Sequence, residues 1–223
     1  MSTVYENNDI NSASEVEQIY AVIHYGGNYI RRITNPSLAV QIAAVQENGE
    51  SIRYIPNPSE AVQLAAVKSN VDSIVHITDP SEAVQLASVQ QRGYTIKFIK
   101  NPSLAVQVAA VQENGESIRF IYNPSEAAQL AAVKTNMYAI RHIKNPSEAV
   151  QLAAVRVAAD SLEYIEHPSH QVAMIALMSM INADYLNDIG NKRFFIHHLK
   201  RIHTQHPEWE ELRVIADDLG VEL

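Results

Sequence analysis

Apolar and polar positions recur along this chain with a fixed period of 22 residues. The consensus of the copies is Asn-Pro-Ser-Glu-Ala-Val-Gln-Leu-Ala-Ala-Val, then a polar turn, then Ile-x-x-Ile. Prolines mark the copies, at Pro36, Pro58, Pro80, Pro102, Pro124, Pro146 and Pro168. A period of this length is typical of repeat proteins, in which each copy forms one supersecondary unit. The pattern therefore predicts a tandem array.

The first half of each copy is expected to form a helix. In the copy that begins at Asn57, this asparagine is a good N-cap and Pro58 suits the first helical position, where its missing N–H has no partner to lose. Glu60 occupies the capping-box position. The residues that follow, up to Val67, are apolar on most sides. A helix with that pattern is enclosed by neighbouring copies instead of lying on a surface.

The second half of each copy predicts a shorter helix. Asn48-Gly49 offers residues that tolerate the left-handed conformation in which many helices end. After this turn, Ile52 and Ile55 lie three positions apart and share one face of a second helix of about a turn and a half. Arg53 and Tyr54 then lie on other faces of this helix. Each copy is thus a helical hairpin.

A hairpin this short cannot bury its own apolar face, so its stability must come from stacking on its neighbours. The predicted fold is all-α, an α-solenoid of short helix-turn-helix repeats with HEAT-like or ankyrin-like stacking and a helical C-terminal cap. Residues 1–34 form a degenerate capping copy, and residues 35–168 form the tandem array. Residues 169–223 form a helical end-piece, with an amphipathic helix over 191–206 and a last acidic helix opened by Pro207.

Composition narrows the function classes. The chain has no cysteine, which excludes disulfides, thiolate metal sites and thiol nucleophiles. Its formal net charge of −8 predicts no bulk attraction to nucleic acid. The N-terminal stretch is polar, and no run approaches the roughly 18 apolar residues that a membrane span needs. We expect a cytoplasmic protein, in the host cytoplasm if it is viral, that does not contact membranes.

The strongest candidate for function lies on the second helices, where cations and rings occupy adjacent positions in successive copies. Val75 and Glu163 interrupt the cationic row, and His76 and His142 belong to the ring row. We name the following residues the cation–ring ladder: Arg31, Arg53, Tyr54, Lys97, Phe98, Arg119, Phe120, Arg141 and Tyr164. Such a ladder could bind an acidic protein surface, phosphates or bases. Alternatively, rings half-buried between copies seal the stack while the arginines stay solvated.

Two other repeated or clustered residue types have less specific meanings. A glutamine recurs at one position of the copies, at Gln18, Gln41, Gln63, Gln85, Gln107, Gln129 and Gln151. These amides could bond backbone groups in the turn of the neighbouring copy, or line a binding surface. His203 and His206 lie three apart on a predicted helix, without a carboxylate or cysteine at a recognised ligand spacing. We therefore expect no metal.

No sequence motif indicates catalysis. The chain lacks a phosphate-binding glycine loop, a nucleophile elbow and a distinctive carboxylate pair. The repeat pattern also continues through the middle of the chain without a break where an active site could be built. We therefore expect no enzyme activity and no cofactor.

The run from Asn57 to Val67, together with Ile-Arg-Tyr-Ile over 52–55, resembles a family of short helical repeats of unknown function from bacteria, bacteriophages and large viruses. The resemblance covers roughly residues 35–168. It implies a stacking scaffold. For a small acidic phage-type protein it also raises the hypothesis of an inhibitor of a host defence system, such as an anti-CRISPR.

Three hypotheses follow from the sequence. The first is a protein-binding solenoid that blocks a partner's surface sterically, the partner being a host protein if the chain is viral. The second is a nucleic-acid-binding repeat protein that uses the cation–ring ladder, and its affinity would fall steeply with salt. The third is a structural element that assembles into homo-oligomers.

Overall fold

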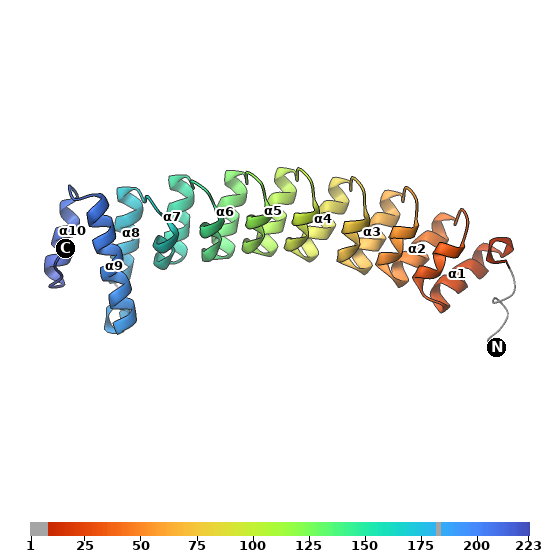
Figure 1. The fold of residues 1–223 in the computed structure, drawn as a ribbon, viewed down its shortest axis with the longest axis horizontal. Coiled ribbons are helices and arrows are strands. Elements are labelled where there is room, and N and C mark those ends of the chain that lie inside the picture. The colour runs from red at the N-terminus through yellow and green to blue at the C-terminus, as the bar shows by residue number, and fades with distance from the viewer. Residues whose placement is uncertain (1–8, 182–183) are drawn as a thin grey trace. The chain divides into compact units, whose positions relative to one another are not determined.

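The computed structural model describes residues 9–181 and 184–223, and these residues form helices without any strand. In the repeats, each α-helix is followed by a short 3-10 helix, written η, and successive pairs pack on one another within each unit (Figure 1). This confirms the predicted α-solenoid of helical repeats. The contacts divide the chain into two compact units, one ending at Asn123 and the other running from Pro124 to Leu223.

The first unit contains six 3-10 helices and five α-helices among its described residues. In chain order they are η1 (Ile10–Ser12), α1 (Glu15–His24), η2 (Gly27–Arg32), α2 (Leu38–Glu47), η3 (Gly49–Tyr54), α3 (Glu60–Ser69), η4 (Val71–His76), α4 (Glu82–Gln91), η5 (Gly93–Phe98), α5 (Leu104–Glu113) and η6 (Gly115–Phe120).

The second unit repeats the same alternation and then departs from it. Its elements are α6 (Glu126–Thr135), η7 (Met137–His142), α7 (Glu148–Val157), η8 (Ala159–Tyr164), α8 (His170–Ile181), η9 (Asp184–Asn187), α9 (Ile189–Gln205) and α10 (Glu210–Asp218). The predicted end-piece helix over 191–206 corresponds to α9. The last helix does not open at Pro207 as predicted, because Trp209 is its N-cap residue.

The second helix of each copy has the 3-10 form, which explains its burial pattern. Residues three apart are eclipsed in a 3-10 helix, which has three residues per turn. Gly49, Ile52 and Ile55 therefore line up on one buried face, and Arg53 and Tyr54 are exposed. The shared isoleucine face is confirmed. The helix is longer than predicted, since it begins at Gly49.

The predicted N-cap asparagine has a different role. Asn57 has φ of 48°, in the left-handed region, and α3 begins three residues later. The N-cap residue is Ser59, with extended φ and ψ of −62° and 159°. In the next copy, the hydroxyl of Ser81 accepts a hydrogen bond of 3.4 Å from the backbone N–H of Val84. Serine thus caps the helix, and asparagine makes the turn before the proline.

The asparagine that follows each first helix was also assigned the wrong conformation. Asn48 is extended, with φ of −147°, and its side chain accepts a hydrogen bond of 3.1 Å from the N–H of Glu50. It therefore caps the 3-10 helix instead of ending the α-helix in the left-handed region. Left-handed residues with φ of 48° to 50° instead precede the prolines, at Asn35, Asn57, Asp79, Asn101, Asn123 and Asn145.

Small apolar side chains form the core of each copy. Val62, Ala66 and Val67 of α3 are fully buried, as is Ile74 of η4. Glu60 does not close a capping box; its carboxylate accepts a short hydrogen bond from the hydroxyl of Ser81, the N-cap of α4. The residues that begin each helix therefore also join neighbouring copies.

Candidate functional site

The buried isoleucines decide which side chains the 3-10 helices expose. Ile96 and Ile118 are almost fully buried, so the residues next to them in sequence lie outside the core. Phe98 remains 44% exposed and Phe120 36% exposed. Tyr54, from the equivalent position of η3, is 38% exposed. These rings are therefore about half-buried, as the sealing interpretation expected, and they also keep part of their surface in solvent, where a partner could contact it.

Cations lie over these rings in η5 and η6. The Nζ of Lys97 is 4.6 Å from the ring centroid of Phe98. The guanidinium carbon of Arg119 is 4.6 Å from the ring centroid of Phe120 and 5.4 Å from that of Tyr94. Cation–ring contacts of this length are attractive because the faces of aromatic rings carry partial negative charge. The cations are consequently held above the rings.

Tyr94 joins the two helices and was missed by the sequence analysis. Its ring meets that of Phe120 edge to face, with the centroids 5.7 Å apart. The equivalent position carries Glu50 in η3 and Glu116 in η6, so a ring in place of an acid was the available signal. We name Tyr94, Lys97, Phe98, Arg119 and Phe120 the cation–aromatic cluster.

The N-terminal ladder residues do not join this cluster. Arg53 forms an ion pair with Glu50, one 3-10 turn earlier in the same helix. Arg31 is exposed on η2, and the cation over a ring there is its neighbour Arg32, 5.2 Å from the ring centroid of Tyr29. The ladder is therefore uneven, and its cations have different partners in different copies.

In the second unit, Arg141 and Tyr164 come together. Both line a cavity of about 570 Å³ to which Lys144 and Glu166 also contribute. Tyr138 lies between them, with its ring centroid 5.9 Å from the guanidinium carbon of Arg141 and 6.1 Å from the ring centroid of Tyr164. Burial of the Tyr164 hydroxyl and the charge of Glu163 raise the pKa of that tyrosine. The ladder residues that line this polar cavity form a second, smaller group.

The repeated glutamines bond within their own copy. The side-chain amide of Gln63 donates a hydrogen bond of 2.9 Å to the carbonyl of Pro58, and Gln85 donates one of 2.8 Å to that of Pro80. The same bond recurs in other copies, at Gln41, Gln107, Gln129 and Gln151. The prediction of a structural role is confirmed, but these bonds close the turn of the same copy rather than the neighbouring one.

The histidines form no ligand set in the described structure. Within residues 9–181 and 184–223, no three His, Asp or Glu side chains gather as metal ligands would. His198 of α9 is only 2% exposed, and its Nδ1 has no hydrogen-bond partner among the described residues. Burial, followed by the charges of Arg201 and His197, lowers its pKa to about 4. His198 is therefore neutral at neutral pH and is part of the packing of α9.

Comparisons of the chain with protein-family models, curated proteins and solved structures gave no match. Among the described helices, none combines the length and the apolar character that crossing a membrane requires.

Proposed function

We propose that this protein is a non-catalytic binding protein that holds a protein partner against the cation–aromatic cluster. The observation that carries the proposal is the pairing of exposed rings with cations fixed above them on η5 and η6. Aromatic and arginine side chains are enriched in protein interfaces and supply most of their binding energy. The cluster offers both residue types on one surface.

The chemistry of the cluster defines the partner. Lys97 and Arg119 would pair with carboxylates, while Phe98, Phe120 and Tyr94 would cover apolar surface around them. Because these side chains already contact one another, little conformational entropy is lost when a partner binds. The partner is therefore a folded protein that presents acidic residues beside an apolar patch.

Nucleic acid is the second candidate, since interleaved cations and rings are also used to bind single strands. Two observations favour protein, because they oppose a strand with a negative charge on every nucleotide more strongly than a protein surface with a few carboxylates. Acidic residues occur one 3-10 turn before two ladder cations, Glu50 before Arg53 and Glu116 before Arg119, where they would repel phosphates. The formal net charge of −8 opposes binding as well. Absence of any shift of single-stranded or double-stranded nucleic acid at low salt would remove this candidate.

For the mode of action, we propose steric blocking of the partner's surface. The repeat signature over residues 35–168 supports the finer hypothesis of a phage-type inhibitor of host defence. The experiment is capture from extracts of the natural host by immobilised protein, with mass spectrometry of what is retained. The double variant Lys97→Glu and Arg119→Glu should lose the partner. The control Lys192→Glu and Arg193→Glu makes the same change in charge on exposed residues of α9 and should keep it.

Three results would count against this proposal. Equal capture by the wild type and the cluster variant would exclude the cluster. Loss of capture in both double variants would indicate a general charge effect. A discrete homo-oligomer that the cluster variant dissociates would favour self-assembly instead of binding to another protein, and light scattering would detect it.

A further inference from the structure

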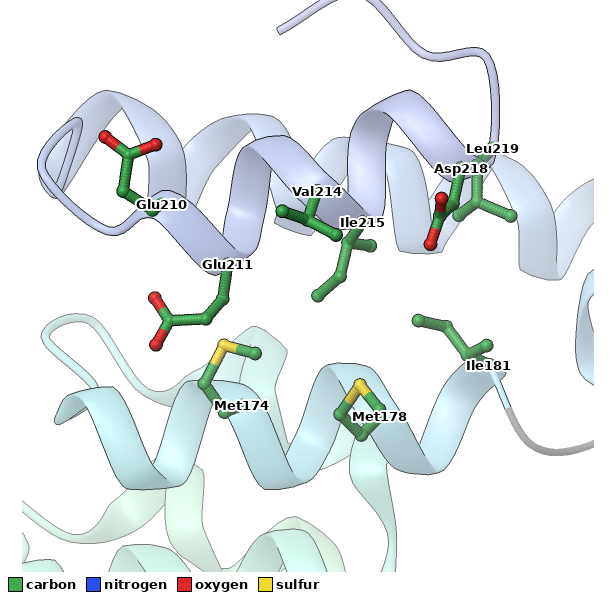
Figure 2. A pocket seen from close by; sticks show the side chains of 9 residues that line it. All are labelled: Met174, Met178, Ile181, Glu210, Glu211, Val214, Ile215, Asp218 and Leu219. Carbon is green, nitrogen blue, oxygen red and sulfur yellow. The ribbon is translucent and has the colours of Figure 1, made fainter.

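An apolar groove opens between α8 and α10 of the second unit. Its volume is about 610 Å³, and Figure 2 shows Met174, Met178 and Ile181 on α8 facing Val214 and Ile215 on α10. Val214 is 59% exposed and Met178 is 46% exposed. Apolar side chains in an open groove lose contact with water only when another molecule covers them.

The sequence of the repeats shows that this groove is a local departure from the pattern. Met178 occupies the position that carries a polar or charged residue in the six copies from Pro36 to Pro146: Gln46, Lys68, Gln90, Gln112, Lys134 and Arg156. His170 similarly stands where four copies have glutamate, at Glu60, Glu82, Glu126 and Glu148. At this one exposed position, the surface of α8 is thus more apolar than that of α2 to α7.

His170 helps to position α10, which forms one wall of the groove. Its Nε2 lies 3.5 Å from Oε1 of Glu211, and its ring meets the Trp209 ring edge to face with the centroids 4.7 Å apart. The Trp209 ring also stacks on the ring of His206 at 3.9 Å. These contacts place the start of α10 next to α8.

The rim of the groove is acidic. Three carboxylates line it, Glu210 and Glu211 at one end and Asp218 at the other, and no lysine or arginine does. Outside the groove, Arg213 lies 3.4 Å from Glu210, and His170 lies 3.5 Å from Glu211. Figure 2 shows the two ends separated by the apolar side chains of α10. An occupant must therefore bring an apolar strip flanked by positive charge, because an acidic or neutral flank would gain nothing from the rim.

The shape of the groove fits a helix. Its walls are two α-helices, and α8 has 12 residues, which makes it about 18 Å long. An amphipathic helix can place residues i, i+3, i+4 and i+7 into such a groove. Methionine side chains adapt to differently shaped anchors because they are unbranched and flexible. A helix bound there would cover the apolar side chains that α8 and α10 leave open.

We propose that this groove binds a basic amphipathic α-helix of a partner protein. The helix inserts its leucine-like face between Met178 and Val214 and pairs its lysines or arginines with Glu210, Glu211 and Asp218. This surface is separate from the cation–aromatic cluster, whose cations select acidic partners. A second copy of this chain fits the groove poorly through α1, because that helix carries Glu15 and Glu17 beside its exposed Val16.

The test uses a synthetic leucine–lysine peptide of about 15 residues with leucines at helical spacing. Its affinity for the full-length protein is measured by fluorescence anisotropy at near-physiological salt. Val214→Glu should weaken binding about tenfold, which corresponds to the loss of one apolar anchor. This variant adds a negative charge, so simple attraction of a cationic peptide predicts tighter binding instead. The matched control Val16→Glu, on exposed α1, should leave the affinity unchanged.

A second variant keeps the test decisive if Val214→Glu fails to fold. Met178→Gln restores the residue that three other copies carry at this position, at Gln46, Gln90 and Gln112, and should also weaken binding. A scrambled peptide of the same composition, without an apolar face, should bind weakly. The proposal is overturned if the scrambled peptide binds equally well, if neither variant weakens binding, or if wild-type protein forms a dimer that Val214→Glu abolishes.

Discussion

The middle repeats and the end-piece use the same helix pattern with opposite results for their apolar surface. In α3, Val62 and Ala66 are fully buried against neighbouring copies. In α8, Val172 and Ala176 are buried in the same way, yet Met178 of that helix is 46% exposed in an open groove. Stacking of similar copies closes the apolar face, whereas a change of partner helix and of a few residues leaves one open. In this chain, the residues that stack the repeats are therefore different from the residues that leave an apolar surface open.

The largest effect should come from the sealed core. Ile96→Ala in η5 should cost about 2 to 5 kcal/mol of unfolding free energy, because Ile96 is 1% exposed and its removal leaves a cavity. Met178→Ala should cost about 1 kcal/mol or less, since the methionine is partly in solvent. Urea denaturation followed by circular dichroism measures both. Equal losses for the two variants would contradict the distinction between closed and open surfaces.

Acid should weaken the second unit through His198. The unfolded chain binds this proton near pH 6.5, whereas the folded chain binds it only near pH 4. Unfolding is therefore favoured as the pH falls from 6.5 to 4, by about 3 kcal/mol in total, with no further loss from this group below that window. Urea denaturation at several pH values, followed by the emission of Trp209, measures the effect.

Variants of two histidines make this acid prediction specific. His198→Leu should remove most of the loss of stability between pH 6.5 and 4, because a leucine takes up no proton. His167→Leu changes an exposed histidine and should leave the loss in place. If His198→Leu retains the full pH dependence, the buried imidazole is not its source.

A smaller effect is expected at Gly49, where two copies approach closely. A Cβ on Gly49 would lie 2.5 Å from the carbonyl oxygen of Ala66 and 2.6 Å from the hydroxyl of Ser73. Gly49→Ala should therefore destabilise the first unit by about 1 to 3 kcal/mol, since backbone atoms must move. Gly190→Ala, whose Cβ would meet only a side-chain oxygen of Asp188 at 3.0 Å, should be nearly neutral. Thermal unfolding distinguishes the two, and a neutral Gly49→Ala would show that the stack yields easily.

The repeat period and the spacing of apolar residues predicted the fold correctly. Seven prolines at one spacing define the copies, and Ile52 and Ile55 identify the buried face of the second helix, because burial of apolar side chains dominates folding. The exposure of Arg53 and Tyr54 follows from the same spacing. The regular repetition of the fold could thus be predicted from the sequence alone.

Local roles were harder to predict where one residue type serves two purposes. Asparagine is favoured both as an N-cap and in the left-handed region, so Asn57 and Asn48 were each assigned to the wrong one. The contact of Tyr94 with Arg119 spans two copies, and its geometry depends on how the 3-10 helices pack. The groove beside Met178 was missed because α10 is not part of a repeat. The 22-residue period therefore gives no information on where α10 packs.

The central claim is that the end-piece, unlike the middle repeats, keeps an apolar face open for a partner. Hydrogen exchange measured by mass spectrometry, with and without the leucine–lysine peptide, tests it most directly. The account predicts slower exchange in α8 and α10 when the peptide is bound, and no change in α2, α3 and α4. Protection spread over the acidic surface of the whole chain, or absent from residues 170–181 and 210–218, would contradict it.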